Sequence, residues 1–116
     1  MKHSVPAQTE NDLIDFYRNA IRTRSYSNQE GDIAVLILKE MEKLGYDKCY
    51  IDRVGNVVGR VGSGKKIIHF DSHMDTVNAG DPALWDHPPF SADYADEYIY
   101  GRGSVDMKGC LLYTSD

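Results

Sequence analysis

Three side chains in two motifs are of the types that hold or orient a metal ion. His73 and Asp75 stand two positions apart, directly after the apolar run 66–70. If the backbone stays extended, both point to the same side, at the carboxyl end of a strand, where open α/β sheets place their ligands. A histidine can then bind a metal through one ring nitrogen while the carboxylate accepts a hydrogen bond from the other. For this pair alone a simpler alternative is favoured, in which His73 is a surface loop residue and Asp75 caps a turn.

Asp106 is the third candidate. It lies in the stretch 101–109, GRGSVDMKG, whose three glycines predict a tight backbone around one carboxylate. The alternative is a helix N-cap, for which aspartate is a preferred residue and which needs no metal. On this motif alone the cap is favoured.

The remaining histidines and a glycine-rich stretch are weaker candidates. Trp85 and Phe90 flank prolines and predict a loop that is pinned by aromatic packing. His87 in this loop is a weak candidate for a metal ligand, and the packing interpretation is favoured. We expect His69 in a strand and His3 in a tail. The GSGK stretch resembles a phosphate-binding loop, but it lacks the G-x-x-x-x-G-K-[ST] spacing and a following helix, so we reject it.

Two amphipathic helices are expected to precede these motifs. Apolar residues recur at helical spacing from about Thr9 to Arg24. A second helix follows, and its start is marked by Ser27 and Glu30 as a capping box. Its end is marked by Gly45, at a position where a left-handed residue is favoured.

Strands are expected after the helices. Residues 48–54 and 56–61 predict a hairpin, and residues 66–70 predict a short buried strand. The stretch 72–95 contains several prolines and glycines and predicts a long loop. A loop of that length inside a domain is usually functional.

The last part of the chain predicts a strand at 98–100, a turn, and a helix that begins near Val105. The order is helix, helix, hairpin, buried strand, long loop, strand and helix start, which predicts an α/β layer built around a sheet. The 116 residues allow one domain with a core. Hydrophobic residues make up 41% and charged residues 27%, which excludes a disordered or collagen-like chain.

Composition also limits the partners. The net charge is -5, and no lysine or arginine run exceeds two residues, which disfavours nucleic-acid binding. No apolar run approaches the ~18–20 residues that cross a bilayer, and the first residues do not resemble a signal peptide. Cys49 and Cys110 are far apart, which favours reduced thiols over a disulfide. We expect a cytoplasmic protein that binds neither nucleic acid nor membrane.

Taken together, the motifs resemble one family. The strings HFDSHMDTV, W-x-x-x-P-F and YGRGSVDMKG occur in this order. Their order and spacing are similar to the start of the co-catalytic dizinc hydrolases of peptidase family M-twenty, which include aminoacylase, acetylornithine deacetylase, succinyl-diaminopimelate desuccinylase and carboxypeptidase G. The stretch LGYDKCYIDRVGNVVGRVG also resembles that family, so the resemblance covers roughly residues 10–109. It implies part of a three-layer α/β/α catalytic domain with a mixed sheet.

The resemblance implies a role for each candidate. His73 matches the family's first zinc-ligand histidine, and Asp75 matches the catalytic aspartate that holds that imidazole. Asp106 matches the aspartate that bridges two zinc ions, which is often followed by a cis peptide, here before Met107. Cobalt or manganese are alternative metals. Two metals ~3.5–4 Å apart polarise a substrate carbonyl and lower the pKa of a shared water.

The chain departs from the family after Gly109. The family's general-base glutamate, an adjacent glutamate ligand, a further carboxylate ligand and a final histidine all follow that point, as does the lid domain. This chain has no Glu-Glu pair, and its last glutamate is Glu97. We expect residues 1–8 to be a loose tail, 9–109 the N-terminal part of the catalytic domain, and 110–116 an atypical tail. We hypothesise a truncated reading frame whose tail is an artefact of sequencing or assembly; a genuine tail is the open alternative.

Two functions stay open on the sequence. In the first, the chain is the N-terminal portion of a zinc-dependent hydrolase that, when complete, cleaves the amide bond of a small peptide or N-acyl amino acid; the full-length protein can then be a homodimer. In the second, it is a stand-alone non-catalytic α/β module with at most weak metal or partner binding. His73 and Asp106 are two ligands where zinc takes three or four. We therefore expect the chain alone to be inactive and to hold zinc weakly.

Overall fold

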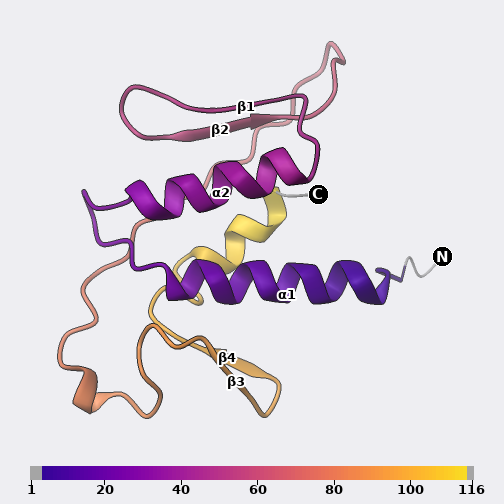
Figure 1. Ribbon diagram of the computed structural model, residues 1–116. Helices are drawn as coiled ribbons and strands as arrows, with labels where there is room; N and C mark the ends of the chain where they lie inside the picture. The colour runs from indigo at the N-terminus through magenta and orange to yellow at the C-terminus, as the bar shows by residue number, and fades with distance from the viewer. Residues whose placement is uncertain (1–3, 115–116) are drawn as a thin grey trace.

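The computed structural model describes residues 4–114. Two α-helices lie side by side with a 3-10 segment between them, and one β-hairpin lies beyond each helix (Figure 1). The elements in chain order are α1 (Ala7–Arg22), α2 (Gly31–Lys43), β1 (Lys48–Ile51), β2 (Val57–Arg60), the 3-10 helix η1 (Pro82–Leu84), β3 (Asp93–Ala95), β4 (Tyr98–Tyr100) and the 3-10 helix η2 (Lys108–Thr114).

The core lies where α1, α2 and η2 meet. The apolar stripe of each helix faces this junction, so the expected amphipathic helices are confirmed; α1 begins and ends two residues earlier than the periodicity indicates. The buried cluster consists of Phe16, Ala20, Ile33, Ile37, Met41 and Leu111. Burial of these side chains supplies most of the stabilisation, at roughly 25 cal/mol per Å² of apolar surface.

The start of α2 differs from the expected capping box. Glu30 is the N-cap, and its side chain makes no cap hydrogen bond. Its Oε1 atom instead accepts from the backbone N–H of Asn28 at 2.7 Å. Ser27 donates its hydroxyl to Asp75, a residue that is remote in sequence. The capping-box prediction is therefore wrong, because the hydroxyl of Ser27 donates to the carboxylate of Asp75 and not to a backbone group at the start of α2.

The end of α2 agrees with the prediction. Gly45 adopts a left-handed φ of +80°. Its N–H donates to the carbonyl of Glu42, and the N–H of Tyr46 donates to the carbonyl of Met41. These two bonds are those of a Schellman motif, which satisfies carbonyls at the helix end.

The strands form two separate antiparallel pairs. Strand β1 pairs with β2 from Lys48↔Arg60 to Ile51↔Val57, and β3 pairs with β4. Parallel pairing in the described part of the chain is limited to a single bridge between Tyr26 and Thr76. The α/β class is confirmed as that of a partial α/β domain, and the sheet content of residues 4–114 is these two hairpins.

Residues 66–70 are not the buried strand that the sequence predicts. The segment is extended but unpaired, and Ile67, Ile68 and Phe70 are 83%, 81% and 62% exposed. An apolar, β-branched run is suited to a strand, but a strand also needs a neighbour for its backbone groups. No segment among residues 4–114 supplies that neighbour.

The long loop is confirmed only in part: it already begins after β2 and contains η1, but residues 93–95, which were expected to belong to it, form β3. The expected helix near Val105 begins instead at Lys108, as a 3-10 helix. Cys49 and Cys110 are free thiols, as expected. Within the described range, no helix is long and apolar enough to cross a membrane.

Candidate functional site

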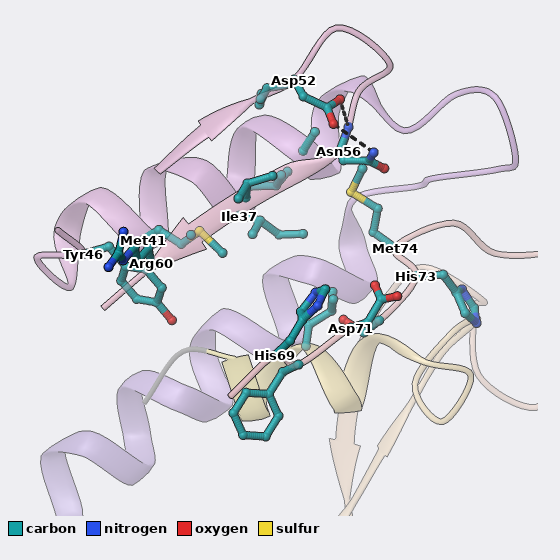
Figure 2. A pocket seen from close by; sticks show the side chains of 18 of the residues that line it. Ile37, Met41, Tyr46, Asp52, Asn56, Arg60, His69, Asp71, His73 and Met74 are labelled. Carbon is teal, nitrogen blue, oxygen red and sulfur yellow. Dashed lines mark hydrogen bonds between the residues drawn. The ribbon is translucent and has the colours of Figure 1, made fainter. Parts of the chain in front are cut away.

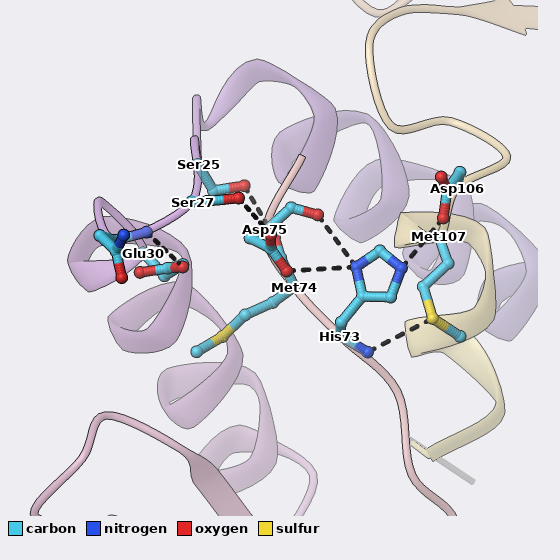
Figure 3. Close-up of polar contacts among 9 residues, drawn as sticks. Ser25, Ser27, Glu30, His73, Met74, Asp75, Asp106 and Met107 are labelled. Atoms are coloured by element: carbon cyan, nitrogen blue, oxygen red, sulfur yellow. Dashed lines mark hydrogen bonds and ion pairs between the residues drawn. The ribbon is translucent and has the colours of Figure 1, made fainter. Parts of the chain in front are cut away.

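His73 lies between two carboxylates (Figure 3). Its Nε2 atom is 2.9 Å from Oδ1 of Asp106. Its Nδ1 atom is 3.0 Å from the backbone carbonyl oxygen of Asp75 and 3.3 Å from Oδ1 of the same residue. The structure therefore brings together the three residues that the sequence singled out, although the two motifs are more than 30 residues apart.

The segment that carries His73 is held by the connection between α1 and α2. The buried Ser25 donates its hydroxyl to the carbonyl of Met74 at 2.8 Å, and its own carbonyl accepts from the N–H of Thr76 at 2.8 Å. Ser27 Oγ donates to Oδ2 of Asp75 at 2.6 Å. On the other side, the N–H of His73 points at the sulfur of Met107 at 3.3 Å.

These bonds also set the charge state of Asp75. The hydroxyl of Ser27, and to a lesser degree the ring of His73, lowers the pKa of the Asp75 carboxyl, against an opposing effect of partial burial. Asp75 is thus an anion at neutral pH, able to accept from the ring N–H of His73.

Asp106 projects from a tight loop. Its side chain is 84% exposed, and the peptide bond to Met107 is cis, as the family resemblance implies. Gly103 has a left-handed φ of +83°, and a methyl group there would meet Cγ2 of Thr76 at 2.6 Å. This close approach brings the Asp106 loop against the segment that carries His73.

Lys108 fixes the other end of the Asp106 loop. Its side chain is buried, and its Nζ donates to the carbonyls of Ala20 and Thr23 at 2.8 Å each. These acceptors lie at the C-terminal end of α1, where the helix dipole favours a cation. Burial lowers the pKa of Lys108 to about 8.

The other histidines lie outside this cluster. Nδ1 of His87 is 3.1 Å from Oδ2 of Asp93, and its ring stacks on Tyr100 with centroids 3.9 Å apart. His69 is exposed and is not part of a strand, because residues 66–70 are unpaired. His3 lies outside the described residues.

Aromatic packing pins the loop around His87, as expected. Nε1 of Trp85 donates to the carbonyl of Ala79 at 2.9 Å, and the guanidinium of Arg102 lies 4.8 Å from its ring centre. Phe90 meets Tyr26 edge to face at 5.9 Å. The Phe90–Tyr26 contact ties the loop to the α1–α2 connection, and the Arg102–Trp85 contact ties it to the turn after β4.

An open cleft of about 1450 Å³ begins beside His73 and continues between α2, the β1–β2 hairpin and the extended segment 66–72 (Figure 2). Ile37 and Met41 form part of its apolar wall, and His69 and Asp71 are among its polar side chains.

The donor set of the site is incomplete for zinc. An imidazole nitrogen and a carboxylate oxygen are both zinc ligand types, and in His73 and Asp106 they face each other. Among residues 4–114, however, no group of three or more histidine, cysteine, aspartate or glutamate side chains is arranged to hold a metal ion. The residues present fit part of a zinc site.

Ser27 and Lys108 are site residues that the sequence analysis missed. The local sequence around Ser27 favours a helix cap, and the local spacing does not indicate its remote partner Asp75. Lys108 stands in the recognised motif, but nothing in its neighbours indicates burial.

Comparisons with known proteins agree with the motifs. The family model described as "Peptidase family M20/M25/M40" matches residues 69–115. The uncharacterised protein YgeY of Escherichia coli (strain K12) is 40% identical over 98 residues, 84% of this chain. Succinyl-diaminopimelate desuccinylases of Paracoccus denitrificans and Wigglesworthia glossinidia brevipalpis are 41% and 33% identical over 76% and 85% of this chain.

The matched part corresponds to 24% of YgeY, 24% of the Paracoccus protein and 27% of the Wigglesworthia protein. The chain therefore spans about a quarter of the length of the curated relatives that it matches. The family match includes His73, Asp75 and Asp106. The motif resemblance is thus confirmed: this chain carries a segment of a protein of peptidase family M20/M25/M40.

Proposed function

We propose that the complete protein is a zinc-dependent hydrolase that cleaves an amide bond in an N-acyl amino acid or small peptide. The observation that carries the proposal is the contact of His73 Nε2 with Asp106 Oδ1, with Asp75 behind the ring. Two relatives named succinyl-diaminopimelate desuccinylase favour an N-acyl amino acid over a peptide. We also propose a cytoplasmic location for this activity.

In this proposal His73 and Asp106 are metal ligands and Asp75 orients the imidazole. Asp75 accepts the Nδ1–H of His73, which turns Nε2 toward Asp106. Asp106 offers two carboxylate oxygens on a mostly exposed side chain and is suited to bridge two cations. When bound, zinc would polarise the amide carbonyl and lower the pKa of a water. The remaining ligands and the general base would come from parts of the complete protein beyond these residues.

The test is hydrolysis by the complete protein and its variants. His73→Ala and Asp106→Ala are each expected to abolish turnover of N-succinyl and N-acetyl amino acids and to lower zinc content. His87→Ala is the matched control, because His87 pairs with Asp93 outside the cluster. Retained turnover in His73→Ala or Asp106→Ala overturns the proposed roles.

We further propose that the 116-residue chain alone is inactive and holds no zinc tightly, since two ligands are fewer than the three or four that zinc takes. Elemental analysis after dialysis checks this. One or two zinc ions retained per chain would contradict it.

A further inference from the structure

We infer that Ser27 is a positioning residue for this site. Its hydroxyl holds the Asp75 carboxylate so that Nδ1 of His73 carries the ring proton and Nε2 presents its lone pair to a cation. The cation part of this inference rests on the proposed function. The effect on the ring proton is a property of the chain by itself.

The geometry of the Asp75 carboxylate carries the inference. Ser27 Oγ lies 2.6 Å from Oδ2, and Oδ1 lies 3.3 Å from Nδ1 of His73. An ionised carboxylate only accepts hydrogen bonds, so the hydroxyl must donate to it. With Oδ2 bound to the serine, Oδ1 is directed toward the imidazole, and one rotamer of Asp75 serves both partners.

Ser27 is in the right place because its backbone is fixed independently. On the same connection, Ser25 makes two bonds to the segment that follows His73, through its hydroxyl to Met74 and through its carbonyl to Thr76. The hydroxyl of Ser27 is not needed at the start of α2, since Glu30 is the N-cap there without a side-chain bond. Figure 3 shows both serines directed at the segment 74–75.

The preference of the imidazole for the Nδ1–H tautomer has to be set by its surroundings, because hydrogen-bond acceptors face both ring nitrogens. A neutral ring has one N–H. At Nδ1 the backbone carbonyl of Asp75 at 3.0 Å and Oδ1 of the same residue at 3.3 Å can accept it, and at Nε2 Oδ1 of Asp106 can accept it at 2.9 Å. Only the Nδ1–H tautomer leaves Nε2 free to bind a metal. The Asp75 side chain is 36% exposed and that of Asp106 is 84% exposed, so water weakens the Asp106 contact more. Ser27 further favours a proton on Nδ1, because its hydroxyl holds the Asp75 carboxylate with Oδ1 toward the ring.

The decisive experiment is nitrogen-15 NMR of the histidine rings in the 116-residue chain, without metal and at a concentration at which light scattering shows a monomer. At about pH 8.5 an unperturbed imidazole is neutral, and the two ring nitrogen shifts report which one carries the proton. The variants are Ser27→Ala and Ser27→Thr; Thr restores the hydroxyl, and its methyl has room because Ser27 is exposed. Ser91→Ala is the matched control, since it removes an exposed serine hydroxyl that donates to Pro88, away from His73.

We expect wild type, Ser27→Thr and Ser91→Ala to be mainly in the Nδ1–H form, and Ser27→Ala to shift toward Nε2–H. An unchanged tautomer in Ser27→Ala overturns the inference. So does a shift in Ser27→Ala that Ser27→Thr does not reverse, because the hydroxyl would then not be the cause. Circular dichroism of each variant checks that the helices are retained.

A second measurement extends the inference to the complete protein. Loss of a direct partner of a metal-bound histidine costs about 10- to 100-fold in metal affinity. Ser27 acts through such a partner, so Ser27→Ala should weaken zinc binding by roughly 3- to 10-fold, with Ser27→Thr near wild type. If the wild-type complete protein neither binds zinc nor hydrolyses amides, the proposed function fails while the tautomer shift stands. If it does both and Ser27→Ala leaves the tautomer unchanged, only the role of Ser27 fails.

Discussion

Lys108 is the residue that joins the Asp106 loop to the helical core. Its ammonium group is buried and bonds to the carbonyls of Ala20 and Thr23, which have no amide partner further along the helix. A buried charge is tolerated only when such partners compensate its lost hydration. The same side chain therefore satisfies carbonyls at the C-terminal end of α1 and anchors the loop that carries Asp106.

Lys108→Met should destabilise the chain by about 1–3 kcal/mol, because it leaves one buried and one half-buried carbonyl without a donor while the apolar stem is retained. Urea unfolding followed by circular dichroism measures the loss. Lys39→Met is the control: Lys39 is exposed on α2, and a surface change of this kind stays within about 0.5 kcal/mol. Equal stabilities of the two variants would contradict the anchoring role.

Residue types and motifs were enough to predict His73, Asp75 and Asp106 as a group, because the spacing of the two motifs is specific in combination. They were not enough to predict Ser27, whose hydroxyl has a local use as a cap and a remote use at Asp75. The remote use prevails in the structure. A local sequence pattern does not show whether a serine hydroxyl bonds to the nearby helix start or to a carboxylate 48 residues away.

At the scale of elements, the two helices and the β1–β2 hairpin were predictable because their partners are close in sequence, whereas β3 lies in the stretch that was expected to be a loop. The α2 stripe and its Gly45 end, and the β1–β2 pair, follow from periodicity and turn residues. Segment 66–70 was not predictable, because a strand is completed by a neighbour that its own residues do not encode. The position of α1 against the end of β4 depends on a glycine, Gly101, that the sequence does not distinguish from a turn glycine.

Gly101→Ala should separate α1 from the turn after β4. A methyl group at Gly101 would overlap the fully buried side chain of Ile21 and approach the carbonyl of Pro89 at 3.2 Å. Overpacking of this kind costs about 1–3 kcal/mol, measurable as a lower midpoint in urea. Gly64→Ala is the control, since its nearest neighbour would be 3.9 Å away. A midpoint for Gly101→Ala equal to that of the control would refute the close contact.

The β1–β2 turn should be sensitive to acid. Asp52 accepts from the side-chain and backbone N–H of Asn56 and from the N–H of Val54, and these bonds lower the pKa of its carboxyl. A lowered pKa in the folded state means stability that is present above the ordinary pKa of about 3.9 and is lost as the pH falls through the folded-state value. Asp52→Ala should therefore destabilise the hairpin at neutral pH and reduce its further loss below about pH 4.

The readout is the amide NMR signals of β1 and β2 between neutral and acid pH. Asp86→Ala is the matched control, because Asp86 is an exposed loop carboxylate in another part of the chain. A pH profile of Asp52→Ala identical to that of the wild type would rule out the proposed role of the turn.

At the scale of the whole molecule, the segment 66–70 exposes three apolar side chains beside the cleft. Its backbone N–H and C=O groups are unpaired within residues 4–114, and Ile67, Ile68 and Phe70 are largely exposed. Unpaired strand-like edges with apolar side chains promote association between chains.

The isolated chain should therefore unfold over a broad temperature range and self-associate as its concentration rises. Ile68→Lys should lower the association seen by light scattering without loss of helical signal, because a charge on an unpaired edge opposes pairing. Leu84→Lys changes an equally exposed residue in η1 and should leave association unchanged. Sharp, cooperative unfolding of a monomeric wild-type chain would contradict this expectation.

The bridge between Tyr26 and Thr76 joins two segments that are remote in sequence, and this bears on the order in which the parts assemble. Helices and hairpins form from contacts near in sequence, whereas the bonds around His73 join residues 33, 48 and 49 positions apart. Closing such loops costs chain entropy before any contact compensates for it. We expect the His73 segment to dock after α1 and α2 have formed and to open first. The amide proton of Thr76, bonded to the carbonyl of Ser25, should then exchange with solvent faster than the amide protons inside α2.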